Sequence, residues 1–159
     1  RGKIDPAARR ITGRNLLEEA IGIAVEAHRA QKDKFGRPSI LHPLRVMQRV
    51  ETDAEKIVAV LHDVVADTNW TLARLAERGF PKHLLDALDC VTKRKGESYT
   101  ALMRRCASHP IARRVKLADL EDNMDLRRLP QITDRDRKRL NKYLRAYRVA
   151  LTCTGTAKN

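Results

Sequence analysis

The apolar segment Val60–Val65, which carries His62 and Asp63 at its middle, constrains the fold more than any other part of the chain. Together with Ile57 and Val58 it predicts a helix that is apolar around much of its circumference, as expected of a helix at the centre of a domain. Charged side chains are rarely buried unless they are paired or bound to a metal. The pair therefore predicts a buried polar site, either a histidine hydrogen-bonded to a carboxylate or two metal ligands on one helix edge.

Apolar residues recur at three-to-four spacing along most of the chain, which is the period of amphipathic helices. No stretch alternates with a period of two over the length of a convincing strand, and no fixed-period repeat occurs. Helices are predicted for residues 16–31, 43–50, 54–65, 72–78, 84–91, 98–107, 111–126 and 134–151. The predicted architecture is an all-α bundle of about seven to nine helices.

Several residues mark the expected helix boundaries. The polar stretch Lys32–Pro38 predicts a loop, and Pro43 is expected at the first position of the helix after it. Asp53 and Thr71 are expected N-caps, and Thr133 with Asp136 resembles a capping box. The last helix is expected to bury one face, formed by Leu140, Tyr143, Leu144, Tyr147 and Leu151.

The length of 159 residues and a hydrophobic content of 42% predict one domain over residues 1–159, with its core between about 15 and 151. The cysteines, Cys90, Cys106 and Cys153, form no CxxC pair, so we expect reduced thiols rather than disulfides or a thiolate zinc site. No apolar run approaches the roughly 20 residues that span a bilayer, and Arg1–Arg14 lacks the apolar stretch of a secretory signal. These features predict a cytoplasmic protein without a membrane segment.

Thirty-three Lys and Arg against twenty Asp and Glu give a net charge of +13. This surplus favours polyanions, namely nucleic acid, acidic membranes or phosphorylated metabolites, and does not choose among them. The aromatic content of 4% weakens the single-stranded nucleic-acid interpretation, because such surfaces usually stack bases on several aromatic rings. Nucleic acid is therefore not the expected partner, and a well-solvated basic surface explains the charge as well.

Five stretches carry a family resemblance in their order and spacing: His28–Gln31, Gly36–Leu44, Leu61–Thr68, Val91–Lys93 and Val115–Met124. Over about residues 28–143 the chain resembles the HD-domain hydrolases of the RelA/SpoT type, particularly the single-domain small alarmone hydrolases. The resemblance implies an HD-type helical bundle. It also implies a metal-dependent phosphohydrolase that removes pyrophosphate from the 3′ position of guanosine tetraphosphate, ppGpp, or of a related nucleotide.

The resemblance further implies that His42, His62, Asp63 and Asp119 are the protein ligands of one manganese ion. Two imidazoles and two carboxylates leave positions for water and a phosphate oxygen, so the ion can acidify the water and polarise the phosphorus. Fe²⁺, Co²⁺ and Zn²⁺ accept the same donors, so the residue types alone do not select Mn²⁺. His28, facing inward at the end of the first predicted helix, is the rival histidine; we expect it to pack beside the site rather than bind the metal.

Active members of this family carry Glu-Asp after the metal pair, whereas this chain has Ala66 and Asp67. Alanine cannot accept a proton, so a rate loss on the order of 10²–10⁴ is expected if the missing carboxylate is required. Asp67 is the expected general base, with Glu121 or Asp122 as alternatives. If no carboxylate activates water, the chain is a catalytically inactive module that binds or senses a nucleotide.

The expected substrate contacts are Lys34, Asn123, Arg139 and Tyr143. Arg139 and Tyr143, at i and i+4, share a helix face and can present a guanidinium beside a hydroxyl group, or can simply be an arginine packed over a half-buried tyrosine. Where the family usually has an arginine before the lysine and a tyrosine after the loop proline, this chain has Asp33 and Ser39. Because both changes remove stacking surface for a base, the substrate can differ from guanosine tetraphosphate.

Overall fold

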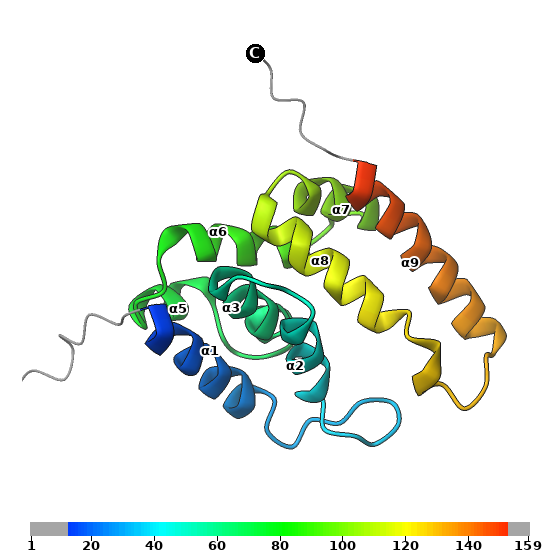
Figure 1. Ribbon diagram of the computed structural model, residues 1–159, viewed down its shortest axis with the longest axis horizontal. Coiled ribbons are helices and arrows are strands. Elements are labelled where there is room, and N and C mark those ends of the chain that lie inside the picture. Colours follow the sequence, from blue (N-terminus) through cyan, green and yellow to red (C-terminus); the bar gives the residue numbers. More distant parts are fainter. Residues whose placement is uncertain (1–12, 153–159) are drawn as a thin grey trace, which may run out of the picture.

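The computed structural model describes residues 13–152 of the chain (Figure 1). Within these residues it contains nine α-helices and a 3-10 helix, and its only β-pairing is an isolated bridge between Lys32 and Pro38. The all-α prediction is therefore confirmed. The elements are α1 (Gly13–Ala27), α2 (Leu41–Gln48), α3 (Asp53–Leu61), α4 (Val64–Asp67), α5 (Leu72–Glu77), α6 (Lys82–Val91), α7 (Tyr99–Ala107), α8 (Pro110–Asn123), η2 (Leu126–Arg128) and α9 (Asp134–Thr152).

Helix α3 lies at the centre of the bundle, as its apolar circumference predicts. Its last five residues, Ile57–Leu61, are all buried, and it packs against α1, α2, α6 and α8. Its N-cap is Thr52 rather than the predicted Asp53. Thr52 Oγ1 accepts a hydrogen bond from the Glu55 amide at 3.2 Å, and the Glu55 carboxylate accepts one from the Thr52 amide. This capping box satisfies two otherwise unpaired amides at the helix start.

The segment predicted as one helix over 54–65 is two helices, α3 and α4, joined at His62 and Asp63. His62 Nδ1 bonds the carbonyl oxygen of Ala59 at 2.6 Å, which is the acceptor that a continuing helix would offer to the amide of Asp63. Helix α4 then ends at Thr68, whose backbone is extended. The metal-type pair therefore occupies the junction between two helices.

Helices α7, α8 and α9 enclose a second, smaller core built around Met103, Leu120, Ala146 and Ala150. Figure 1 shows α8 and α9 running side by side, in agreement with their contacts. The predicted apolar face of α9 is wrong in part, because Leu144 and Leu151 are 44% and 45% exposed. The small alanines of α9 face its neighbours instead, since they allow close approach of the helices.

Other helix ends differ from the predicted ones for local reasons. Helix α1 ends at Ala27 rather than near Gln31, because the next residues form a turn in which Ala30 has a φ of 64°. Helix α8 ends at Asn123, and the chain re-forms a short 3-10 turn, η2, afterwards. The predicted cap at Thr71 and the capping box of Thr133 with Asp136 are both confirmed.

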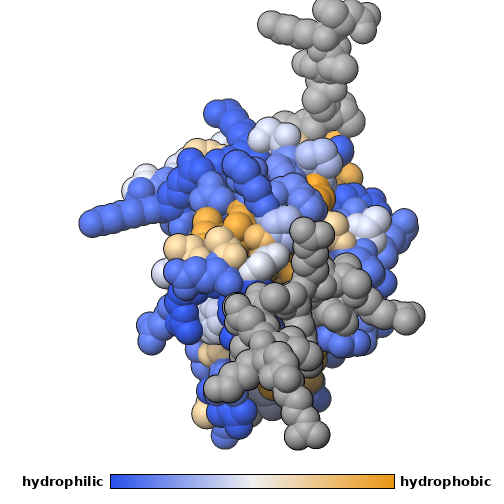
Figure 2. Space-filling model, turned by 90° about the vertical axis from the view of Figure 1, so that its left-hand side faces the viewer, coloured by the Kyte–Doolittle hydropathy of each residue, from blue (hydrophilic) through white to orange (hydrophobic). Residues whose placement is uncertain are grey.

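Hydrophilic residues dominate the part of the surface visible in Figure 2, which agrees with the charged content of 33%. No helix within residues 13–152 is long and apolar enough to cross a membrane. Cys90 and Cys106 are free thiols, and Cys153 lies outside the described residues.

Candidate metal centre and its pocket

Three helices bring four predicted ligands together. Helix α2 carries His42, the α3–α4 junction carries His62 and Asp63, and α8 carries Asp119. Donor atoms of His42, His62 and Asp119 all lie within 4.8 Å of one another, a spacing at which one ion can bridge them. Asp119 Oδ1 is 3.1 Å from His42 Nε2 and 3.8 Å from His62 Nε2.

Asp63 lies at the open edge of this cluster. Its carboxylate oxygens are 3.1 Å from His62 Nε2 and 3.8 Å from His42 Nε2. The Asp63 side chain is 30% exposed, whereas those of His62 and Asp119 are 6% and 7% exposed. Asp63 is therefore more open to solvent than the buried donors His62 and Asp119.

The orientation of His62 fits a metal ligand. Because a backbone carbonyl can only accept, the 2.6 Å contact with Ala59 means that Nδ1 carries the proton. Nε2 is then a buried lone pair that has no hydrogen-bond partner, although it faces two carboxylates. A buried acceptor left unpaired is costly, and a cation at the centre of the cluster would satisfy it.

His42 and Asp119 form the charged part of the cluster. Burial disfavours charge on His42, but its hydrogen bonds to Asp119 and Asp122 outweigh this effect and raise its pKa to about 9. Burial likewise opposes charge on Asp119, whereas Lys116 at 2.7 Å and the two histidines hold the pKa of the carboxyl well below its usual range. A divalent ion would replace the proton on His42 Nε2 as the positive partner of Asp119.

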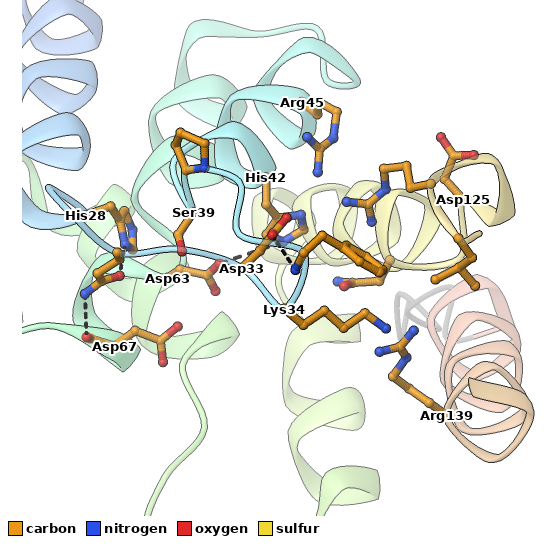
Figure 3. A pocket seen from close by; sticks show the side chains of 16 residues that line it. His28, Asp33, Lys34, Ser39, His42, Arg45, Asp63, Asp67, Asp125 and Arg139 are labelled. Atoms are coloured by element: carbon orange, nitrogen blue, oxygen red, sulfur yellow. Dashed lines mark hydrogen bonds and ion pairs between the residues drawn. The ribbon is translucent and has the colours of Figure 1, made fainter. Parts of the chain in front are cut away.

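A cavity of about 280 Å³ opens beside the cluster. Figure 3 shows Asp63 and Asp67 toward one end, Lys34 and Arg139 toward the other, and His42 between them. We call the end that carries Asp63 and Asp67 the acidic end of the pocket, and the end that carries Lys34 and Arg139 its basic end. Its other lining residues are His28, Gln31, Asp33, Phe35, Pro38, Ser39, Arg45, Asn123, Asp125, Arg128 and Leu129.

The acidic end contains the predicted base. Asp67 lines the pocket, and partial burial together with the neighbouring Asp63 raises its pKa. Ala66 is exposed and does not line the pocket. His28, 4% exposed, lines it but is not one of the clustered donors; its Nδ1 contacts Gln31 Oε1 at 2.8 Å and its Nε2 has no partner.

The two alternative bases do not reach the pocket. Glu121 accepts a hydrogen bond from the Tyr147 hydroxyl at 2.9 Å and does not line the cavity. Asp122 is fully buried on the side of His42 that faces away from Asp119. Neither carboxylate is placed to take a proton from water in the pocket. The geometry therefore argues against Glu121 and Asp122 as the general base.

At the basic end, Lys34 and Arg139 both contact Asp136 Oδ1, at 3.2 and 2.8 Å. Asp136 thus caps α9 and also pairs with two cations that line the pocket. The local sequence predicts only the capping role, because the contact with Lys34 joins residues 102 positions apart. Tyr143 does not line the pocket; it packs against the second core, as a half-buried tyrosine.

Asn123 lines the pocket, but its amide is engaged by the cluster. Its Nδ2 donates to Asp119 Oδ1 at 2.6 Å and to the Asp119 carbonyl at 3.0 Å. Asn123 therefore holds a candidate ligand in place, in addition to facing the cavity.

Two basic residues escaped the sequence analysis. Arg45 and Arg128 line the pocket, and both lie against Asp122. Arg45 follows His42 by one helical turn, and this i,i+3 spacing is the signal that would have suggested it. Arg128 follows Asn123 only after a turn, and its position could not be read from helical spacing.

The two loop residues that depart from the family pattern, Asp33 and Ser39, both line the pocket. Asp33 Oδ1 accepts the amides of Phe35 and Arg37 at 2.8 and 2.9 Å, so this carboxylate closes the loop that carries Lys34. Asp33, which replaces an arginine of the family pattern, therefore stabilises the turn of this loop.

No family model matches the chain. The guanosine-3′,5′-bis(diphosphate) 3′-pyrophosphohydrolase of Aquifex aeolicus is 33% identical over 120 residues, which is 68% of this chain and 17% of the relative. The probable GTP pyrophosphokinase of Mycobacterium leprae is 32% identical over 123 residues, covering 69% of this chain and 16% of the relative. The chain thus spans about a sixth of the length of these curated relatives.

A solved structure of a metazoan ortholog of SpoT that hydrolyzes ppGpp is similar along almost its whole length. The TM-score is 0.69 with 24% sequence identity, covering 97% of this chain and 91% of that one. The two proteins share the fold.

Proposed function

Because the chain belongs to the RelA/SpoT-type hydrolase family, we propose that it is a metal-dependent phosphohydrolase acting on guanosine tetraphosphate or a related nucleotide. One observation carries this proposal. The cluster of His42, His62, Asp63 and Asp119 lies at the acidic end of a pocket whose other end presents Lys34 and Arg139. A phosphate ester that spans such a pocket meets a cation site and a basic site at once.

We propose Mn²⁺ as the resident ion, held by these two imidazoles and two carboxylates. A divalent ion supplies Lewis acidity there, which acidifies water and polarises a phosphate. The orphaned Nε2 of buried His62 supports an ion rather than an ordinary hydrogen-bond network. Other divalent transition metals fit the same donors, so the choice of Mn²⁺ rests on the family.

The reaction that we propose is hydrolysis of the ester at the 3′ position. Asp67 takes a proton from water, and the water oxygen bonds to the phosphorus that is attached to the 3′ oxygen. The bond between that phosphorus and the 3′ oxygen breaks, so pyrophosphate leaves and the 3′ oxygen takes up a proton. The raised pKa of Asp67 makes its carboxylate a stronger base.

Lys34 and Arg139 would hold the phosphate groups. Arg139 offers a planar fork of donors, and Lys34 offers a compact charge. Both cations already contact Asp136, and this restricts their side chains before a phosphate binds. Less conformational entropy is then lost on binding. The attacked phosphorus is then fixed relative to Asp67 across the pocket.

The proposal is tested by incubating the purified chain with Mn²⁺ and guanosine tetraphosphate and measuring released pyrophosphate. We expect turnover that Asp63→Asn reduces by at least about 10²-fold, because this change removes one ligand charge at the open edge of the cluster. The exposed Asp134→Asn is the matched control and should leave the rate unchanged. Protein with metal fully bound that turns over no nucleotide would contradict the hydrolase function.

Ala66 favours a second candidate, a module that binds a nucleotide without hydrolysing it. The chain would keep the metal donors and the basic end of the pocket. It would lack the glutamate of the Glu-Asp pair that active relatives carry, because Ala66 stands in its place. Calorimetry separates the candidates: tight binding of guanosine tetraphosphate without release of pyrophosphate supports the binding module.

A further inference from the structure

Asp122 is a completely buried carboxylate that takes no part in the proposed chemistry. It lies on α8, three residues after Asp119, so the two side chains leave adjacent turns of one helix. Burying a carboxylate is costly unless its charge and both oxygens are satisfied. The partners of Asp122 therefore indicate why this position is acidic.

One partner is the metal-type histidine of α2. His42 Nδ1 lies 2.7 Å from Asp122 Oδ2, while the opposite ring nitrogen, Nε2, faces Asp119 and Asp63. An ionised carboxylate only accepts hydrogen bonds, so Nδ1 is the donor. Arg45 donates two further hydrogen bonds to the same carboxylate, so Asp122 acts as an acceptor toward all of its partners.

The other partners lock Asp122 itself. Arg45 donates to both carboxylate oxygens, at 2.8 and 3.0 Å. Guanidinium nitrogens of Arg49 and Arg128 lie 3.6 and 3.5 Å from the same group. Because both oxygens are engaged, the carboxylate cannot rotate away from His42.

We propose that Asp122 is a positioning residue for the metal centre: it fixes His42 with Nδ1 protonated and Nε2 directed at the ion. The Ala59 carbonyl does the same for His62, so each imidazole of the cluster has its own acceptor on the far side. Such partners fix the tautomer of a ligand and raise its basicity. This inference rests on the metal centre of the proposed function.

The test compares Asp122→Asn with the wild-type chain in Mn²⁺ binding, followed by electron paramagnetic resonance of the free ion, and in the visible absorption spectrum of the Co²⁺-loaded protein. We expect the dissociation constant for Mn²⁺ to rise by about 10–100-fold. We also expect the Co²⁺ bands to shift, because an amide no longer enforces the ring orientation. Asp122→Ser, which is smaller, serves if the amide variant does not fold.

Glu121→Gln is the matched control. It removes a neighbouring carboxylate on the same helix that contacts Tyr147 rather than His42, so it reports any effect of lost charge alone. Its Mn²⁺ dissociation constant should stay within about twofold of the wild-type value, and its Co²⁺ spectrum should not change.

The outcomes separate the two proposals. A wild-type chain without affinity for Mn²⁺ or Co²⁺ would overturn the proposed function. If the wild type binds both ions and a folded Asp122 variant keeps the same affinity and spectrum, the positioning role is wrong and Asp122 only pairs with the arginines around it. A lower melting temperature with unchanged metal binding would lead to that same conclusion.

Discussion

His62 Nδ1 donates a 2.6 Å hydrogen bond to the carbonyl oxygen of Ala59, and this contact turns Nε2 of the same ring toward Asp119. The ring is 6% exposed, so neither nitrogen has water as an alternative partner. One backbone carbonyl thus selects the tautomer in which the metal-facing nitrogen is a free lone pair. The same hydrogen bond lies at the end of α3, directly before the junction with α4.

We predict that His62→Gln weakens Mn²⁺ binding by at least about 10²-fold, since losing even an outer partner of a ligand typically costs 10–100-fold. Isothermal titration of the purified chain with Mn²⁺ gives the dissociation constant. His83→Gln makes the same change at an exposed histidine that is not part of the cluster and should bind as the wild type does. Equal affinities for the two variants would remove His62 from the ligand set.

The metal-free protein should lose stability as the pH rises from about 6.5 to 9. His42 gains carboxylate partners on folding, which against the effect of burial raises its pKa to about 9. Its contribution is fully present below the unfolded pKa of about 6.5 and is lost as the pH rises through 9. The change is on the order of 2 kcal/mol, or about 4–8 °C in melting temperature for a chain of this size.

This dependence is measured by thermal unfolding in the presence of a chelator between pH 6 and 9.5. His42→Gln should flatten the curve in that window. Asp119, whose pKa is lowered in the fold, acts in a separate range: its contribution is present above its usual pKa near 4 and is lost in acid. A melting temperature of the metal-free wild type that is constant from pH 6.5 to 9 would contradict the role of His42.

The sequence was sufficient for the parts of the fold that local chemistry determines. The spacing of apolar residues predicted the helical class, and Thr71, Thr133 and Asp136 marked helix starts that the structure confirms. The turn at His62 was not predictable in this way, because an apolar run that continues past it reads as one helix. At the end of α3 the Ala59 carbonyl accepts a hydrogen bond from the His62 side chain, and such a contact leaves no trace in periodicity.

Contacts between distant residues explain what was missed in the site. Asp122 meets His42 across 80 positions, and Lys34 meets Asp136 across 102. Helical spacing shows which side chains share a face but does not show which face of another helix they meet. For the same reason Leu144 was predicted to be buried, although Ala146 and Ala150 are the α9 residues buried in the second core.

The corrected packing of α9 predicts a difference between two leucines. Leu102 of α7 is 3% exposed, whereas Leu144 of α9 is 44% exposed. We expect Leu102→Ala to lower the free energy of unfolding by about 2–5 kcal/mol and Leu144→Ala by about 0.5 kcal/mol or less. Urea denaturation of both variants measures this, and similar losses would mean that Leu144 is buried after all.

Arg139→Gln should weaken substrate binding more than catalysis. Its guanidinium lines the pocket beside Lys34 and is held by Asp136 at 2.8 Å. Hydrogen bonds to charged groups contribute about 1.5–3 kcal/mol, so we expect KM for guanosine tetraphosphate to rise about 10–100-fold with a smaller change in kcat. Steady-state kinetics of pyrophosphate release provide both constants.

Arg135→Gln is the control for this change, because it removes the same charge from an exposed position one turn earlier on α9. If both variants raise KM equally, the effect comes from net charge and not from a phosphate contact of Arg139.

Ala66→Glu should raise the rate of pyrophosphate release if the missing carboxylate limits turnover. Ala66 is exposed on α4, three residues after Asp63 and directly before Asp67, so a longer acidic side chain meets no packed neighbour and starts beside the acidic end of the pocket. A second group that orients water typically contributes 10²–10⁴-fold, and we expect a gain of about 10²-fold in kcat with Mn²⁺ saturating.

Ala73→Glu on α5 makes the same substitution at an exposed position that does not line the pocket, and it should leave kcat unchanged. Equal turnover by Ala66→Glu and the wild type, with the metal bound in both, would mean that Asp67 activates water without a neighbouring carboxylate.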